Sequence, residues 1–360
     1  MTTLSVVVPA FNEAELIGQC LDGLVKQTRA IDEIVVVDNG STDGTAAIVD
    51  SYVNDHNNVT RVVEKEPGVI HARRCGFDFA TGDVIAKTDA DSLVAPDWAE
   101  RIVNFFDSSV GSEFAALTGL VLCWDGPSRG LQHKLMTMTL GRLAEGGTIG
   151  GLGGPNYAVR NSAWKEVSDT LQTDPDTWED LDLSLALSEA GYKMYFDPGL
   201  QVDASCRQLR HSPWQNRSYI SGGVRTAARR GNDLAVKALR IQRPFRFVGF
   251  TAMWLLFRPW DHEKRNWRPH RLLTPGEASA SGDECPSFRP VIGSPASRLS
   301  SLAKVGSRRP VSLWVVRLRC RPALTHRLCR YAQRPTLNLG RRRPDGRVRV
   351  TFRRRIATDS

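Results

Sequence analysis

Two carboxylates stand one residue apart at Asp89 and Asp91, directly after a short apolar run. The run Asp83–Lys87 predicts a β-strand, so both acids should emerge at its carboxyl end. Carboxylate oxygens in such a place suit Mg²⁺ or Mn²⁺ bridging a diphosphate. Acidic pairs are common in loops, so this pair indicates a metal site only together with other motifs.

A third acid, Asp38, ends the β-branched run that begins at Glu33. The polar residues that follow it, 39–44, are typical of an Asx turn and a helix cap. Capping explains these neighbours well but does not explain Asp38 itself. A carboxylate at the end of a strand can accept a hydrogen bond from a nucleobase imide or a ribose hydroxyl, so we interpret Asp38 as a nucleotide contact.

Acids also open a helix later in the chain. The predicted helix Trp178–Ala190 begins with Glu179, Asp180 and Asp182 and stops at Gly191. Acids at a helix N-terminus stabilise it by about 0.3 to 1 kcal/mol each, which is one explanation for them. A positioned carboxylate can equally act as a general base. The residues alone leave both interpretations open.

The elements that must position these acids alternate from the start of the chain. Strands are predicted at Leu4–Val8, Glu33–Val37, Val59–Glu64 and Asp83–Lys87, with helices at Glu13–Gln27, Thr45–Val53 and Ile70–Ala80. Such alternation predicts an α/β fold, a Rossmann-like, mostly parallel sheet flanked by helices. Ligands of such sheets bind beyond the carboxyl ends of the strands, where Asp38, Asp89 and Asp91 lie.

A glycine-rich segment, Gly146–Asn156, follows a further predicted strand at Ala115–Trp124. We expect neither helix nor regular strand from so many glycines, and interpret the segment as a flexible loop near the site.

Three segments, Val7–Glu13, Asp38–Thr45 and Asp89–Asp91, together resemble the nucleotide-binding half of family 2 glycosyltransferases of the GT-A fold. The resemblance continues through Gly154–Arg160 and Trp178–Leu183, and it covers residue 3 to about residue 230. It implies a nucleotide-sugar donor linked to UDP or GDP. The residues implied to bind the donor are Pro9, Ala10, Phe11, Glu13, Asp38, Arg73, Asp89 and Asn156.

The resemblance also implies a mechanism. Asp180, beside Glu179, would deprotonate an acceptor hydroxyl, and a one-step displacement would invert the anomeric centre. Asp89 and Asp91 would hold Mg²⁺ or Mn²⁺, which together with Arg73 would stabilise the leaving diphosphate. The acceptor would be a glycan or a lipid-linked sugar, in the synthesis of a cell-surface glycan, polysaccharide or glycolipid.

Several basic residues near these motifs have two interpretations each. His211 stands where some relatives carry an extra metal ligand or phosphate contact, although a lone histidine is more often structural. The sequence predicts either a basic rim for the diphosphate or a solvated helix face at Arg225, Arg229 and Arg230. Arg74 replaces the asparagine usual in the family.

The apolar segment Phe247–Phe257 has arginines on both sides. At ~1.5 Å per residue it would cover roughly 17 Å of a hydrocarbon core about 30 Å thick, so it cannot span a bilayer. It fits either a core-docking helix or a helix lying on the cytoplasmic face of a membrane. We therefore predict a GT-A domain at 1–235, this apolar and basic segment at 236–264, and a disordered tail at 265–360.

The formal net charge of +9 is concentrated at the C-terminus. From Arg289 onward there are 19 Lys and Arg against two acids, whereas the rest has 29 basic and 37 acidic residues. The acidic body excludes a nucleic-acid footprint there, and no nucleic-acid partner is expected. The tail fits a frame-shifted extension, a solvated basic tail or an anionic-lipid tether, and binding of nucleic acid by its arginines would be steeply salt-dependent.

Seven cysteines at wide spacing, without a CxxC pair, predict neither a zinc site nor a disulfide framework. With no signal-peptide pattern at the N-terminus, we expect a cytoplasmic location. Two other functions remain. A sugar nucleotidyltransferase is disfavoured because Pro9–Glu13 stands where its glycine-rich phosphate loop should be, and a catalytically impaired nucleotide-sugar-binding protein is disfavoured because the motifs are intact.

Overall fold

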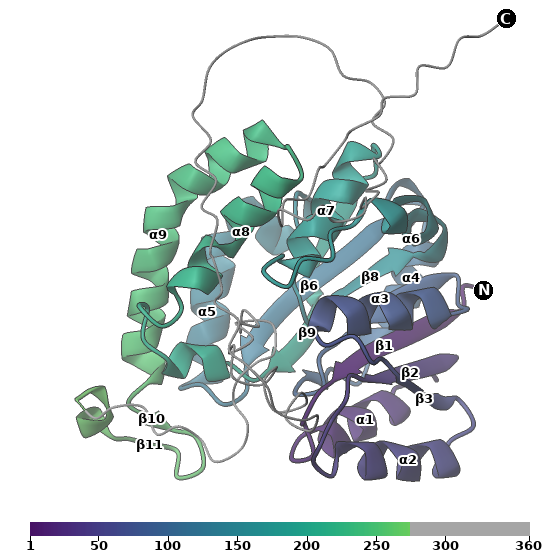
Figure 1. Ribbon diagram of the computed structural model, residues 1–360, viewed down its shortest axis with the longest axis horizontal. Coiled ribbons are helices and arrows are strands. Elements are labelled where there is room, and N and C mark those ends of the chain that lie inside the picture. The colour runs from purple at the N-terminus through teal and green to yellow at the C-terminus, as the bar shows by residue number, and fades with distance from the viewer. Residues whose placement is uncertain (274–360) are drawn as a thin grey trace, which may run out of the picture. The chain divides into compact units, whose positions relative to one another are not determined.

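The computed structural model of the chain describes residues 1–273, which lie within one unit, Met1–Ser294 (Figure 1). Most of the tail predicted at 265–360 therefore lies outside the described residues, and its first part forms short elements given below.

The first half of the sheet is parallel, as predicted. Its strands are β1 (Leu4–Ala10), β2 (Glu33–Asp38), β3 (Val59–Val63) and β4 (Val84–Lys87), in the order β3-β2-β1-β4. The helices between them are α1 (Ile17–Val25), α2 (Thr45–Asp55) and α3 (Val69–Phe79). The predicted α/β alternation is confirmed, because the β-branched runs are buried and the intervening segments present apolar residues at helical spacing.

The second half of the sheet is mixed. It contains β5 (Leu93–Val94), β6 (Ala116–Cys123), β7 (Gly147–Ile149), β8 (Tyr157–Arg160) and β9 (Met194–Ala204). The strand β8 pairs antiparallel with both β4 and β6, while β9 runs parallel to β6 and antiparallel to β5 and β7.

The expectation of a structureless loop at Gly146–Asn156 is wrong for Gly147–Ile149, which forms β7 against β9. Gly146 and Gly147 adopt positive φ values of 88° and 145°, and these residues turn the chain into the strand. Thr148 and Ile149 then supply ordinary strand residues.

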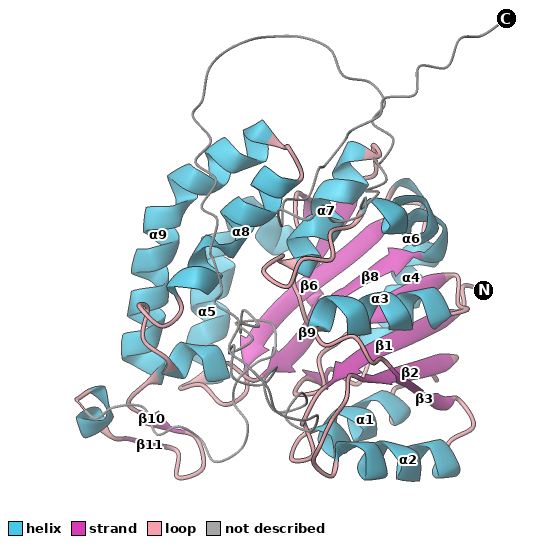
Figure 2. Ribbon diagram, in the orientation of Figure 1, coloured by secondary structure: helices cyan, strands magenta, loops and turns pink. Residues whose placement is uncertain are grey.

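Helices cover both faces of the sheet (Figure 2). Alternate residues of a strand point to opposite faces. Val6 and Val8 accordingly pack with α1 and with α4 (Trp98–Asp107), while Val7 packs with residues of α3, α6 (Asn161–Val167) and α7 (Glu179–Glu189). Both faces are therefore buried, which fixes the strand ends that carry the acidic motifs.

The remaining elements follow or flank the sheet. They are α5 (Arg129–Leu140), α8 (Arg217–Arg229), α9 (Asp233–Phe257), β10 (Trp260–Asp261), β11 (Asn266–Trp267) and the 3₁₀ turns Gly111–Glu113, Gly141–Glu145, Ser168–Thr170, η4 (Arg207–Arg210) and Pro269–Leu272. The 11-residue helix expected at Phe247–Phe257 is the second half of α9, which has 25 residues and continues through Pro244. Within residues 1–273, no helix is both long and apolar enough to cross a membrane.

A disulfide joins Cys123 and Cys206, so the prediction of no disulfide is wrong for this pair. The two residues are 83 positions apart in sequence, but β6 and β9 are parallel neighbours and Cys123 aligns with Ala204. Their Cα atoms are 5.6 Å apart, within the usual range for a disulfide. Cysteine spacing could not indicate this pair, because the pairing of the two strands brings it together.

Candidate active site

The loops after β1 and β2 are bonded to each other at the carboxyl edge of the sheet. The backbone N–H of Asn12 donates to Ser41 Oγ at 3.1 Å, and that of Glu13 donates to Thr45 Oγ1 at 2.8 Å. In return, Asn12 Oδ1 accepts from the N–H of Thr42 at 2.8 Å. The polar residues after Asp38 thus hold the β1 loop, and Asp43 Oδ1 accepts from the N–H of Thr45, the first residue of α2, at 2.9 Å.

Asp38 lies at this edge and is buried. Its Oδ1 accepts a hydrogen bond from the N–H of Ser41 at 3.0 Å, and its Oδ2 is 3.6 Å from a nitrogen of Arg61. The neighbouring residues predicted to contact the donor are Pro9 and Ala10, both buried, and the partly buried Phe11. Ala10 aligns with Asp38 across β1 and β2, so these predicted contact residues lie side by side at one edge of the sheet.

Arg207 of η4 lies between two acids, with one guanidinium nitrogen 2.6 Å from Glu13 Oε1 and 3.0 Å from Asp91 Oδ2. Burial and the charge of Asp89 raise the pKa of Asp91 to about 7, although Arg207 opposes the shift. Burial likewise raises the pKa of Glu13 against the effect of Arg207. Two carboxylates, those of Glu13 and Asp91, therefore share one guanidinium in a buried setting.

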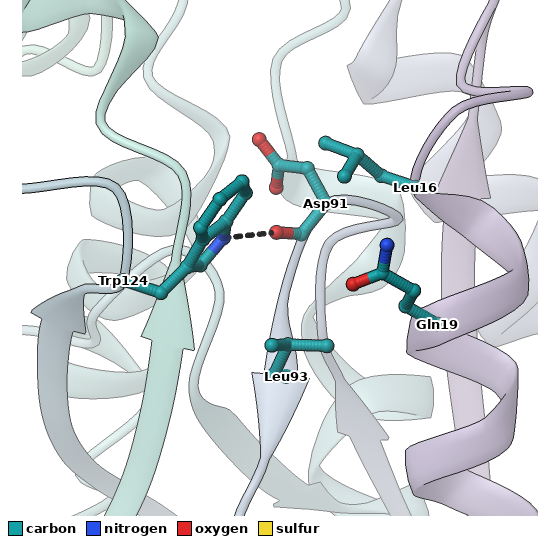
Figure 3. A pocket seen from close by; sticks show the side chains of 5 residues that line it. All are labelled: Leu16, Gln19, Asp91, Leu93 and Trp124. Atoms are coloured by element: carbon teal, nitrogen blue, oxygen red, sulfur yellow. Dashed lines mark hydrogen bonds between the residues drawn. The ribbon is translucent and has the colours of Figure 1, made fainter. Parts of the chain in front are cut away.

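A shallow depression borders Asp91 and is lined by Leu16, Gln19, Leu93 and Trp124 (Figure 3). Trp124, next to the end of β6, donates its indole N–H to the carbonyl of Asp91 at 3.1 Å. In Figure 3 the Asp91 carboxylate projects between Trp124 and Leu16. The backbone of Asp91 is thus fixed while its carboxylate is held toward Arg207.

Lys87, the last residue of β4, connects this cluster to α7. Its side chain is buried, and its ammonium is 2.6 Å from Asp89 Oδ1 and 3.6 Å from Glu179 Oε1. It also donates to the carbonyl of Gly154 at 2.9 Å. Burial lowers the pKa of Lys87, but the charges of Asp89 and Glu179 outweigh burial and raise it. Lys87 is therefore a charged bridge between the two acidic motifs.

Asp180 lies in the first turn of α7 and is partly buried. Its Oδ1 accepts from the N–H of Leu181 at 2.8 Å. Burial and the charge of Glu179 raise the pKa of Asp180 to about 6, while Lys87 and Arg73 oppose the shift. A carboxylate with this pKa is ionised at neutral pH and can still accept a proton readily.

Asp182, in contrast, is a structural residue. Its carboxylate is fully buried, accepts two hydrogen bonds from Gln172, and is 2.9 Å from a nitrogen of Arg230. The acids at the start of α7 therefore have different partners. Asp182 joins α7 to the end of α8 through Arg230, whereas Glu179 faces Lys87.

Two predicted donor contacts lie in the interior instead of at an open surface. Arg73 is 1% exposed, donates to the carbonyl of Glu179 and lies 5.8 Å from the ring of Trp164. Asn156 is fully buried, accepts from Trp98 Nε1 at 2.9 Å and donates to two β-strand carbonyls. The structure thus departs from the expected placement: Arg73 supports the backbone before Asp180, and Asn156 links strands of the sheet.

The predicted basic rim is also largely engaged in packing. Arg230 contacts Asp182 and, at 2.8 Å, Glu189, while Arg225 donates to the carbonyl of Ser218 at 3.0 Å. His211 follows η4 directly and is partly buried. These contacts favour a role in joining α7 and α8 for Arg230.

Sequence reasoning does not single out Lys87 or Arg207. A lysine inside a strand that is otherwise apolar is a weak sign that acids surround it. Arg207 carries no such sign, because its place depends on β9, which returns the chain to the β1 loop.

The donor set at Asp89 and Asp91 fits a divalent cation. Both side chains offer hard oxygen ligands, and burial, followed by the charge of Asp89, raises the pKa of Asp91. No group of three or more His, Cys, Asp and Glu side chains suited to a metal occurs in the described part of the chain. Further ligands would have to come from a diphosphate or water, as Mg²⁺ commonly accepts.

Residues 5–163 match the family described as glycosyl transferase family 2. Glycosyltransferase AglE of Haloferax volcanii is 36% identical over 104 residues, which are 28% of this chain and 34% of that protein. Glycosyltransferase GlyG of Streptococcus pneumoniae is 35% identical over 137 residues, 33% of this chain and 45% of that protein. The chain thus covers less than half the length of these relatives.

The fold is similar to that of the mannosyltransferase PcManGT from Pyrobaculum calidifontis, which was solved in complex with GDP-Man and Mn²⁺. The TM-score is 0.51 at 23% identity, over 70% of this chain and 74% of that one. At this identity the likeness concerns the fold alone, and it confirms the predicted GT-A architecture.

Proposed function

Because residues 5–163 match glycosyl transferase family 2, we propose that this chain transfers a sugar from a nucleotide-diphosphate donor to an acceptor hydroxyl. The observation that carries the proposal is the buried ammonium of Lys87 between Asp89 and Glu179. Lys87 thereby connects Asp89, a candidate cation ligand, with Glu179, the neighbour of the candidate base Asp180. The proposed acceptor is a glycan or a lipid-linked sugar.

The donor nucleoside is proposed to bind at the loops after β1 and β2, which are hydrogen-bonded to each other. Asp38 would accept a hydrogen bond from it. A screen of UDP- and GDP-linked sugars distinguishes the two nucleotides. The binding of GDP-Man by PcManGT supports a nucleotide-sugar ligand for this fold.

Asp89 and Asp91 are the proposed ligands of a divalent cation, and Mn²⁺ in the PcManGT complex supports that choice. Such a cation would neutralise charge on the leaving diphosphate. Arg207 is the guanidinium we assign to the diphosphate, in place of Arg73. Its partners Glu13 and Asp91 hold it beside the cation ligands, whereas Arg73 is enclosed behind Glu179.

Asp180 is the proposed general base. At neutral pH it is ionised, because its pKa is raised only to about 6, so it can remove the proton of an acceptor hydroxyl as the oxygen attacks the anomeric carbon. A single displacement would invert that carbon. Arg73 and Lys87 would fix the base by holding the carbonyl and the side chain of Glu179.

The test is a screen of UDP- and GDP-sugars for Mn²⁺- or Mg²⁺-dependent binding and transfer by the full chain. Asp180→Asn should bind donor normally and lose transfer by about 10²- to 10⁴-fold, the usual contribution of a general base. Asp176→Asn, four residues earlier on the same segment, is the matched control and should transfer normally. Unchanged transfer by Asp180→Asn would remove Asp180 from the mechanism, and donor binding without transfer by the wild type would make the chain a binding protein.

A further inference from the structure

One face of α9 is apolar and exposed. Its side chains recur at intervals of three, four or seven residues, so they form a single stripe along the helix. The stripe consists of Leu234, Ile241, Phe245, Val248 and Leu255, whose exposed fractions are 81, 69, 74, 67 and 49%. Large apolar groups in such continuity usually mark an interaction site.

The opposite face of α9 already packs against the protein. Val236 and Phe257 are buried there, and Arg246 lies 4.5 Å from the ring of Trp178. Figure 1 shows α9 alongside α8, which lies on the side toward the sheet. A surface helix needs one apolar face to pack and normally keeps the other polar. The exposed stripe is therefore not explained by folding.

The charge of the helix selects the kind of partner. Lys237 and Arg240 are exposed on or beside this face of α9, and the sequence of the helix has a single acid, Asp233, in the first turn. Trp214 is 70% exposed and packs edge-on against Phe247, with ring centroids 5.8 Å apart. Apolar side chains bordered by basic residues and tryptophan are typical of helices that lie in an anionic membrane interface.

We propose that α9 docks the protein on an anionic lipid surface, with the stripe among the acyl chains and the basic residues at the lipid phosphates. A second copy of the chain would bring like charges of two α9 helices together. The chain's own C-terminal part is also unsuited, because it carries 19 basic residues against two acids from Arg289 onward. The inference goes beyond the proposed sugar transfer and does not depend on it.

Vesicle sedimentation of the full chain tests the proposal, with phosphatidylcholine vesicles prepared with or without phosphatidylglycerol. Phe245→Ser/Val248→Ser removes the centre of the stripe without touching the core. Val63→Ser/Phe79→Ser is the matched control, since these residues are 52 and 45% exposed on β3 and α3. Wild type and control should bind the anionic vesicles, and the stripe variant should bind at least about tenfold more weakly, from the lost apolar burial.

Measurements at high salt distinguish vesicle binding through the stripe from binding through the basic C-terminal part, because salt screens charges but leaves apolar burial intact. The difference between wild type and stripe variant should therefore persist at high salt. Equal binding by the two proteins, or no binding by the wild type, would overturn the proposal. So would self-association of the wild type that the stripe variant abolishes without any vesicle binding. Transfer to a soluble acceptor, measured in parallel, should be the same in both and reports on the proposed function separately.

Discussion

Replacing Lys87 by methionine removes the ammonium that contacts Asp89 and Glu179 while keeping nearly the same side-chain volume. Breaking a buried ion pair by removing one partner costs about 3 to 5 kcal/mol, since a buried charge loses its partner. The side chains of Asp89 and Glu179 are 38 and 16% exposed, so water can partly solvate what remains. We therefore expect a loss near the lower limit, about 3 kcal/mol in the free energy of unfolding.

Urea unfolding of the full chain measures this loss. Lys193→Met is the control, because Lys193 is 3.4 Å from Glu113 with both side chains more than half exposed, and such pairs contribute about 0 to 1 kcal/mol. Adding Glu179→Gln to Lys87→Met should restore part of the lost stability, because one of the unpaired charges is then gone. A loss below about 1 kcal/mol for Lys87→Met, similar to the control, would refute the charged bridge.

Three further predictions concern the base, the arginine and the disulfide. Because Asp180 must be ionised to accept a proton and its pKa is raised to about 6, the transfer rate should fall as the pH drops below about 6, and a flat profile between pH 5 and pH 8 would contradict this role. Arg207→Gln should weaken donor binding about tenfold, the value of a charged hydrogen bond, in calorimetric titrations with Mn²⁺, whereas unchanged affinity would place Arg207 outside the donor site. Reduction of Cys123–Cys206 should lower the free energy of unfolding by about 2 to 4 kcal/mol, and Cys123→Ser/Cys206→Ser, which lacks the cross-link, should not respond to the reductant.

The sequence predicts those parts of the molecule whose geometry is local. Asp38 ends β2 and Asp89 follows β4, and parallel pairing through β1 brings both strand ends to one edge. Asp180 opens α7 as expected. In each case the residue's position depends on a strand or helix that its own neighbours specify.

Other features depend on packing and strand pairing between distant parts of the chain, which local sequence patterns do not indicate. The side-chain directions of Arg73 and Asn156 follow from packing against Trp164 and Trp98, and no local pattern indicates that both side chains are buried. Arg207 reaches Glu13 only because β9 joins the sheet. Hydropathy indicates only the second half of α9, because the first half alternates apolar and basic residues.

The central claim is a one-step displacement with Asp180 as base, and the stereochemistry of the product tests it most directly. Once a donor is found, proton NMR of the first product from the full chain gives the configuration at the transferred anomeric carbon. We expect the configuration opposite to that of the donor. A product with the donor's own configuration would contradict direct displacement.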